Sequence, residues 1–297
     1  LYSIFFMLSD FDIIEEKITK FNIAFLPLIF SLIVIGWFVG FLRWNILLKN
    51  AGINIPFKSS FSVFISGLSL LFIPGSIGDF IKAQILKNKF NVSKSKSSAI
   101  IISDILYATV GLVILTLIGG LFFEISFYIG IISGSGLILL FLILKTQKTL
   151  SWFVKTFSKI KFISSRTKNL EDSFEVIKKS TSGKITIYCS LLSVLFWLID
   201  ACAAFFIMYA YGISSLDILE AITVYTSSIL LGYISLIPLG MGVVEGSLII
   251  FLQNYGIELS VALTAPIIIR LFTRWFSICV GFFALKYNDG FKILKEL

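Results

Sequence analysis

The residues of this chain that could carry chemistry are a few charged side chains embedded in apolar sequence. They are Asp79, Lys82, Asp104, Asp200, Glu245, Arg270 and Arg274. A charge near the middle of a membrane helix costs roughly 2.5–3.5 kcal/mol on insertion scales, so such residues usually face a bundle interior or a wet cavity. We therefore expect these side chains to mark the functional part of the molecule.

Arg270 and Arg274 are four residues apart, so on an α-helix they share one face and cannot neutralise each other. They require either an anionic ligand or a carboxylate from another helix, such as Asp104, Asp200 or Glu245. A guanidinium matches both carboxylate and phosphate with a bidentate fork. For Asp104 and Asp200, a structural ion pair and a role in ion or proton coupling are equally good interpretations.

Most enzymatic chemistry is excluded by what the sequence lacks. The chain has no histidine, which removes histidine-ligated metal sites and Ser-His-Asp or Cys-His catalysis. Cys189, Cys202 and Cys279 are far apart in apolar runs, so they predict neither a zinc site nor a disulfide framework. No GxxxxGK[ST], GxGxxG or HExxH motif occurs. We therefore predict a protein that is not an enzyme and has no metal or cofactor.

The elements that must position these charges are membrane helices. Of the 297 residues, 57% are hydrophobic and only 14% are charged, and the mean hydropathy is +0.98, which is too apolar for a soluble domain. A spanning helix needs about 20 mostly apolar residues. The segments that meet this requirement are Phe21–Leu42, Ser97–Phe123, Ile125–Leu144, Ile185–Leu216 and Leu259–Leu285.

Two further apolar segments are interrupted by proline and glycine. Ser59–Ile77 contains Ile73-Pro74-Gly75, and Ala221–Val244 contains Ile237-Pro238. Proline breaks a straight helix, and non-helical backbone at membrane depth persists only inside protein or beside a wet cavity. Both segments are therefore predicted to be broken helices or re-entrant hairpins.

The two breaks share the pattern I-P-x-x-x-G, and the predicted topology inserts them from opposite membrane faces. This combination predicts an inverted repeat, which in transporters places the substrate site near mid-membrane. A broken helix exposes amides that attract an anion, and glycines let a headgroup approach them closely. The candidate substrate-binding residues are Pro74, Gly75, Ser76, Gly78, Asp79, Lys82, Pro238, Gly240, Gly242, Glu245, Arg270 and Arg274.

The loops predict one orientation and one domain. The basic loop 145–184 is cytoplasmic by the positive-inside rule, as is the C-terminal tail. This loop separates repeat 1, about 21–144, from repeat 2, about 185–285. Basic loops account for much of the net charge of +8, so no nucleic-acid partner is needed. Arg43-Trp44 and Lys286-Tyr287 are interpreted as interfacial anchors, and Leu1–Leu8 as the remnant of a truncated helix, with a short interfacial helix as the alternative.

These residues resemble the lysylphosphatidylglycerol synthase transmembrane region, a family of flippase-like integral membrane proteins. The matching features are Arg43-Trp44 with Leu47-Leu48 and Gly52, the run from Ile73 to Ala83, the run from Ile237 to Glu245, and Arg270 with the helix from Trp275 to Gly281. Two departures stand out. In the second motif, Leu239 stands at the position that Gly75 holds in the first. In addition, Ala99–Ser103 lacks the arginine that often precedes Asp104 in relatives, so the resemblance supplies no partner for Asp104.

The resemblance implies the part of bacterial lipid-aminoacylating enzymes that moves charged phospholipid between leaflets, without the soluble aminoacyl-transferase domain. We therefore expect an all-α polytopic transmembrane bundle in a prokaryotic cell membrane, acting on membrane lipids with anionic or modified headgroups. Two alternatives stay open. One is a small-solute secondary transporter, and the other is a non-transporting accessory subunit that partners a lipid- or glycan-modifying enzyme.

Overall fold

The computed structural model describes residues 19, 21–71, 79–145, 170–181, 183–235, 237–288 and 290. Within these described residues, five helical spans are long and apolar enough to cross a membrane: Ile23–Asn50, Lys94–Gly119, Glu124–Ile143, Lys184–Ala210 and Leu259–Tyr287. Each overlaps one of the five predicted spans, with ends that differ by up to eight residues, so the prediction of an all-helical, polytopic membrane protein is confirmed. Within the described part of the chain there is no β-strand.

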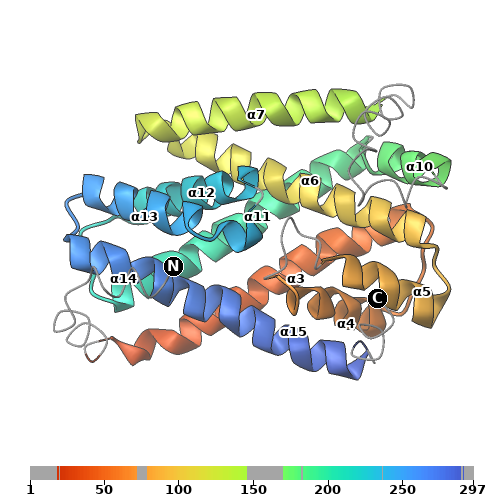
Figure 1. The fold of residues 1–297 in the computed structure, drawn as a ribbon, viewed down its shortest axis with the longest axis horizontal. Helices are drawn as coiled ribbons and strands as arrows, with labels where there is room; N and C mark the ends of the chain where they lie inside the picture. Colours follow the sequence, from red (N-terminus) through yellow and green to blue (C-terminus); the bar gives the residue numbers. More distant parts are fainter. Residues whose placement is uncertain are drawn as a thin grey trace.

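Four of the five spans are single α-helices, and they run along the long axis of the molecule (Figure 1). These are α3 (Leu26–Asn50, preceded by the 3-10 turn Ile23–Phe25), α6 (Lys94–Gly119), α7 (Glu124–Lys145) and α11 (Lys184–Ala210). The fifth span is composite, because α14 (Leu259–Arg270) continues through a π-helical turn, η5 (Leu271–Trp275), into α15 (Phe276–Tyr287).

The other helices of the described part of the chain are short. They are α4 (Phe57–Leu68), α5 (Ile81–Phe90), α10 (Leu170–Ser180), α12 (Ile218–Ile234), the 3-10 turn η4 (Pro238–Gly240) and α13 (Val243–Asn254). In Figure 1, α4 and α5 lie toward one end of the molecule, and α12 and α13 lie toward the other.

Polar side chains set where several helices begin. Ser93 accepts a hydrogen bond from the Lys96 amide and starts α6. Asp217 and Glu220 form a reciprocal capping box at the start of α12, with bonds of 2.8 and 2.9 Å. These caps satisfy amides that a helix leaves unpaired at its first turn.

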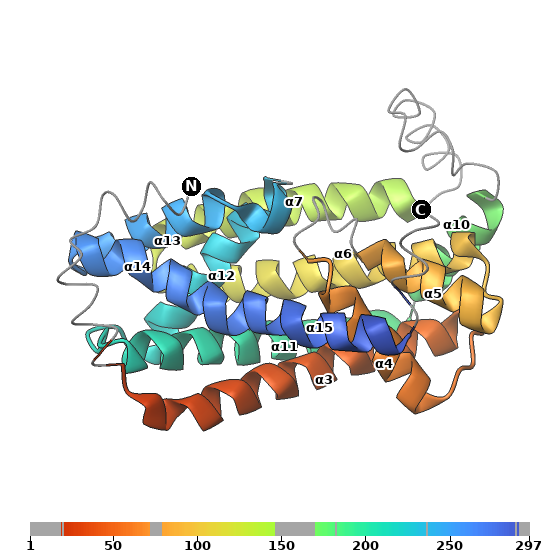
Figure 2. The same cartoon turned by 60° about the horizontal axis from the view of Figure 1, so that its bottom comes forward.

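The helices differ strongly in how much of their surface faces other helices. In the most apolar 18-residue stretch of α6, 67% is buried inside the protein, whereas in that of α7 17% is buried. Figure 2 shows α7 along the side of the bundle opposite α3. Close approach of α6 to α11 depends on Gly111, where a Cβ atom would lie 2.5 Å from the Ser193 carbonyl carbon. Small residues of this kind let membrane helices pack at short distance.

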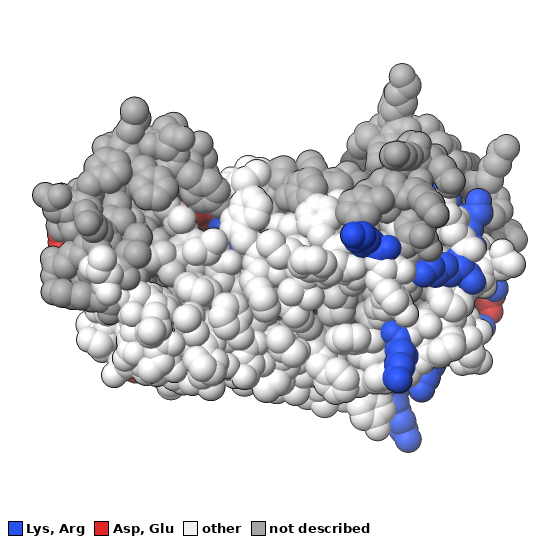
Figure 3. Space-filling view, turned by 90° about the horizontal axis from the view of Figure 1, so that it is seen from below, with Lys and Arg blue, Asp and Glu red and all other residues white. Residues whose placement is uncertain are grey.

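Exposed charges gather at the two ends of the bundle and leave the face between them uncharged. In Figure 3 the lysines and arginines lie over the end that holds α4 and α5. The exposed lysines at this end of the helices include Lys49, Lys58, Lys87, Lys89 and Lys286. The opposite ends of the helices carry acids instead, among them Glu124, Asp217 and Glu258.

Candidate functional site

A chain of alternating charges joins α3, α5 and α6 inside the bundle. The Nε of Arg43 lies 2.7 Å from Oδ1 of Asp104, and its Nη1 donates to the Ser193 hydroxyl at 2.9 Å. The Nζ of Lys82 lies 2.8 Å from Oδ1 of Asp79 and 4.0 Å from Oδ2 of Asp104. The ammonium of Lys82 also sits over aromatic rings of the core, which favours a desolvated cation.

The interpretation of Arg43-Trp44 as an interfacial anchor is wrong, because both side chains are buried in the bundle. Arg43 is 5% exposed and Trp44 is fully buried. The predicted span ended at Leu42, but α3 continues to Asn50, which carries Arg43 two turns into the bundle. Arg43 thereby supplies the partner for Asp104 that the resemblance did not.

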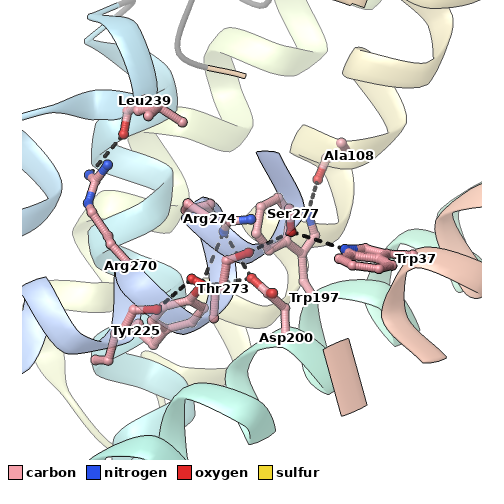
Figure 4. A network of polar contacts seen from close by, with 11 residues as sticks. Trp37, Ala108, Trp197, Asp200, Tyr225, Leu239, Arg270, Thr273, Arg274 and Ser277 are labelled. Carbon is pink, nitrogen blue, oxygen red and sulfur yellow. Dashed lines mark hydrogen bonds and ion pairs between the residues drawn. The ribbon is translucent and has the colours of Figure 1, made fainter. Parts of the chain in front are cut away.

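A second ion pair joins α11, α12 and the π-helical turn η5. The Nη2 of Arg274 lies 3.0 Å from Oδ2 of Asp200 and 3.2 Å from the hydroxyl of Tyr225. Tyr225 donates its hydroxyl proton to the same Asp200 oxygen at 2.7 Å. Figure 4 shows the three side chains converging from three elements, with the indole of Trp197 beside Arg274.

Arg270 and Arg274 do not share a partner. Arg270 lies on the last turn of α14, and the π-helical turn begins at the next residue. Residues four apart lie close to one face in a π-helical turn as in an α-helix, so the two side chains part because they extend in different directions. Figure 4 shows Arg270 reaching the Leu239 carbonyl while Arg274 reaches Asp200. The geometry therefore separates the two arginines that sequence spacing alone brings together.

Arg270 stabilises the break before α13. Its Nε lies 2.7 Å from Oε1 of Glu245, and its Nη2 donates to the Leu239 carbonyl at 2.9 Å. Glu245 is fully buried, and its second oxygen accepts from the Gly242 amide at 2.7 Å. The protein's own carboxylate thus occupies the amide end of α13. Leu239 adopts a left-handed conformation with φ of 52°, which is strained for a branched residue and is fixed here by the Arg270 contact.

The two ion-pair groups line a single cavity of about 110 Å³ near mid-bundle. Its charged lining residues are Arg43, Asp79, Lys82, Asp104, Asp200 and Arg274. Its other walls include Trp37 and Trp197, which are tied to neighbouring helices by hydrogen bonds to Ser277 and the Ala108 carbonyl. The cavity therefore gathers six charged side chains inside an otherwise apolar molecule.

A larger and mainly apolar groove of about 450 Å³ adjoins the charged cavity. The residues that line both hollows are Leu71, Asp79, Ile105, Tyr233 and Arg274. The groove runs between α7 and α12, and Ile132, 70% exposed, and Ile234, 51% exposed, lie on its lining. These exposed side chains lie on the apolar face of the molecule, so the groove connects the charged cavity with the lipid-facing surface.

The structure brings together part of the predicted site. Asp79, Lys82 and Arg274 meet Asp104 and Asp200 around the cavity, and Gly240 lines the groove. Glu245, Gly242 and Arg270 form the cap of α13, and Pro238 begins the turn η4. Pro74, Gly75, Ser76 and Gly78 lie outside the described residues, as do Leu1–Leu8 and residues 146–169 of the basic loop.

Arg43, Trp37, Trp197, Tyr225 and Tyr233 are site residues that the sequence analysis missed. Arg43 carried a signal, since it is followed by seven more residues without a helix breaker. The aromatic residues carried none, because rings of this kind recur throughout the chain. Among the described residues, no group of three or more Cys, Asp or Glu side chains is placed to bind a metal ion.

Long apolar helices around a buried set of ion pairs define a polytopic integral membrane protein. The chain belongs to the family described as the lysylphosphatidylglycerol synthase TM region, whose sequence pattern matches residues 1–281. This finding confirms the family resemblance inferred from the sequence motifs.

Similar proteins are known from archaea, and each is named only as a UPF0104 membrane protein. One, from Methanothermobacter thermautotrophicus, is 23% identical over 92% of this chain and 88% of its own length. Another, from Pyrococcus horikoshii, is 25% identical over 88% of this chain and 86% of its own. A third, from Methanocaldococcus jannaschii, is 29% identical over 75% of this chain and 95% of its own. No solved structure matches the chain.

Proposed function

We propose that this protein is a flippase-like transporter that moves an anionic or modified phospholipid, or a lipid-linked headgroup, between membrane leaflets. The observation that carries the proposal is the charged cavity that shares a wall with an apolar groove. A lipid has the same division, since its headgroup needs polar partners and its chains need apolar surface.

The arrangement of the short helices supports a transporter. The turn η4 interrupts the α12–α13 segment, and the α4–α5 segment lies toward the other end of the bundle (Figure 1). We interpret the two segments as re-entrant hairpins of an inverted repeat. In transporters with this architecture, substrate sites lie between discontinuous helices near mid-membrane.

The distribution of exposed charge supports an orientation. We assign the end with the exposed lysines (Figure 3) to the cytoplasmic side of a prokaryotic cell membrane, because basic residues accumulate there. The same lysines would contact anionic lipid headgroups at that surface.

No nucleotide motif occurs in the sequence, so we infer movement down a gradient or coupled to an ion gradient rather than driven by hydrolysis. Asp104 and Asp200 hold buried guanidinium groups at 2.7 and 3.0 Å. Release of such a carboxylate by protonation or by substrate is the step through which an ion gradient would act.

Two alternatives make different predictions. A small-solute transporter needs no apolar groove beside its polar cavity, so the groove favours a lipid. An accessory subunit of a lipid- or glycan-modifying complex would transport nothing alone and would co-purify with its enzyme.

The test is translocation of acyl-labelled fluorescent phospholipids in proteoliposomes, with dithionite bleaching of the outer leaflet. We expect the wild type to accelerate exchange and Arg274→Gln to abolish most of the acceleration. Glu124→Gln, at an exposed position on the start of α7, is the matched control and should retain the wild-type rate. Rates equal to those of protein-free vesicles for every anionic, zwitterionic and lipid-linked substrate would sink the proposal.

A further inference from the structure

The charges that line the cavity are balanced. Of the described lining residues, three are cationic (Arg43, Lys82 and Arg274) and three are carboxylates (Asp79, Asp104 and Asp200). A purely anionic headgroup would bring its phosphate among three carboxylates, and like charges in a poorly hydrated site repel strongly. The cavity is therefore built for a ligand that offers charge of both signs.

The ion pair of Arg274 and Asp200 leaves both a hydrogen-bond donor and a hydrogen-bond acceptor available to a ligand. Arg274 uses only Nη2 for Asp200 and Tyr225, so within the described residues its Nε and Nη1 have no acceptor. Asp200 uses only Oδ2, and its Oδ1 has no donor among these residues. A ligand can thus gain a charge-assisted hydrogen bond here without breaking the ion pair.

Two charges of opposite sign stand where the cavity meets the groove. Asp79 and Arg274 are the charged residues that line both hollows. Their side chains are 20% and 18% exposed, whereas those of Lys82, Arg43, Asp104 and Asp200 are 3–10% exposed. A headgroup whose chains lie in the groove therefore meets Asp79 and Arg274 first.

We infer that the headgroup carries an ammonium beside its phosphate, as in a zwitterionic phospholipid of the phosphatidylethanolamine type. Asp79 binds the ammonium through its Oδ2, since Lys82 contacts Oδ1 and no other described residue contacts Oδ2, and Arg274 binds the phosphate. This inference rests on the proposed function and narrows its substrate class from anionic or modified lipids to lipids that carry both charges.

The test compares three acyl-labelled lipids in the same proteoliposomes: phosphatidylethanolamine, its N-acetyl derivative without the amine charge, and phosphatidylglycerol. We expect the wild type to move phosphatidylethanolamine about tenfold faster than the other two, the effect of one charge-assisted hydrogen bond. Asp79→Asn should bring the three rates together by slowing phosphatidylethanolamine alone. A merely structural role of Asp79 would slow all three lipids equally, and this result would overturn the inference.

A second variant guards against a folding defect caused by an unpaired Lys82. Asp79→Asn/Lys82→Met removes the ion pair as a unit and leaves the net charge unchanged, and it should lose the same selectivity. Glu124→Gln should keep it.

Binding separates failure of this inference from failure of the proposed function. Trp37 and Trp197 line the cavity, so their fluorescence reports lipid binding to the purified protein in detergent. Selective, Asp79-dependent binding of phosphatidylethanolamine without translocation would support the inference and overturn the proposed function. Equal or tighter binding of phosphatidylglycerol would overturn the inference, even in a protein that translocates lipid.

Discussion

At the scale of single residues, each buried charge of the site is held by one of opposite sign. Arg43 pairs with Asp104, Lys82 with Asp79, Arg270 with Glu245 and Arg274 with Asp200. Removing one member of a buried pair leaves an uncompensated charge, which costs far more than the pair contributes. These residues are therefore coupled in pairs, and single substitutions report on the partner as much as on the residue changed.

Arg43 and Asp104 provide a test of this coupling. We expect Arg43→Gln or Asp104→Asn alone to lower the free energy of unfolding by about 3–5 kcal/mol, and the double variant to lose clearly less than the sum. The measurement is a double-mutant cycle from unfolding of the purified protein in mixed micelles.

The matched control is Glu175 and Lys179, an exposed pair four residues apart on α10 with a separation of 2.6 Å. A hydrogen bond from Lys179 lowers the pKa of the Glu175 carboxyl, so this carboxyl is ionised at pH 7. An exposed pair contributes less than about 1 kcal/mol. Additive effects at Arg43 and Asp104, as small as those of the control pair, would show that the buried pair is not formed.

The sequence predicted which charges lie at membrane depth but not how they pair. Spacing along a helix placed Arg270 and Arg274 together, but their guanidinium groups pair with different carboxylates, Glu245 and Asp200. A π-helical turn leaves no local signal in this sequence, because Leu271–Trp275 is ordinary helix-forming sequence. The partner of Asp104 lies 61 residues away, and such a distant contact is set by packing rather than by local pattern.

At the scale of elements, irregular backbone positions the site. The π-helical turn directs Arg274 into the cavity, and the turn η4 offers its Leu239 carbonyl to Arg270. Pro238 predicted that the helix is interrupted at η4. The conformation of this turn depends on Glu245 and Arg270, which lie outside it. The existence of the five long spans was predictable, because apolar runs of this length leave no other solution in a bilayer, whereas the end of α3 at Asn50 and the π-helical turn in the fifth span were not.

Helix contacts at glycine give a prediction for α6. We expect Gly111→Ala to destabilise the protein by about 1–3 kcal/mol, because the new methyl group would overlap the Ser193 backbone and push α6 from α11. Gly136→Ala on α7 is the control, since a Cβ there meets nothing within 4 Å. Thermal unfolding in detergent measures both, and equal melting temperatures for the two variants would contradict this packing.

At the scale of the whole molecule, exposed basic and acidic residues lie at opposite ends of the bundle, and the buried charges lie between them. Lysines cover one end of the bundle, acids lie at the other, and the buried ion pairs surround the cavity between them. The same sorting places the groove on the apolar flank, which the proposed function makes the entry for a lipid chain. Composition predicted the bilayer setting, but the cavity and the groove emerge only from the packed helices.

Orientation follows from this sorting and can be measured. In a variant with Cys189, Cys202 and Cys279 replaced by alanine, we expect Asp217→Cys to react with a membrane-impermeant maleimide on intact cells. Lys87→Cys should react only after the membrane is opened. The reverse pattern would contradict the assignment of the basic end to the cytoplasm.

The most direct test of the proposed function is to map the residues that a lipid headgroup contacts. A phospholipid with a photoreactive diazirine on its headgroup is incorporated into proteoliposomes and crosslinked, and the labelled residues are mapped by mass spectrometry. We expect labelling of Trp37, Trp197 and Tyr233, which line the cavity, and loss of this labelling in Arg274→Gln. Labelling confined to helix ends, such as Tyr287 and the residues around Glu124, would contradict the proposed function.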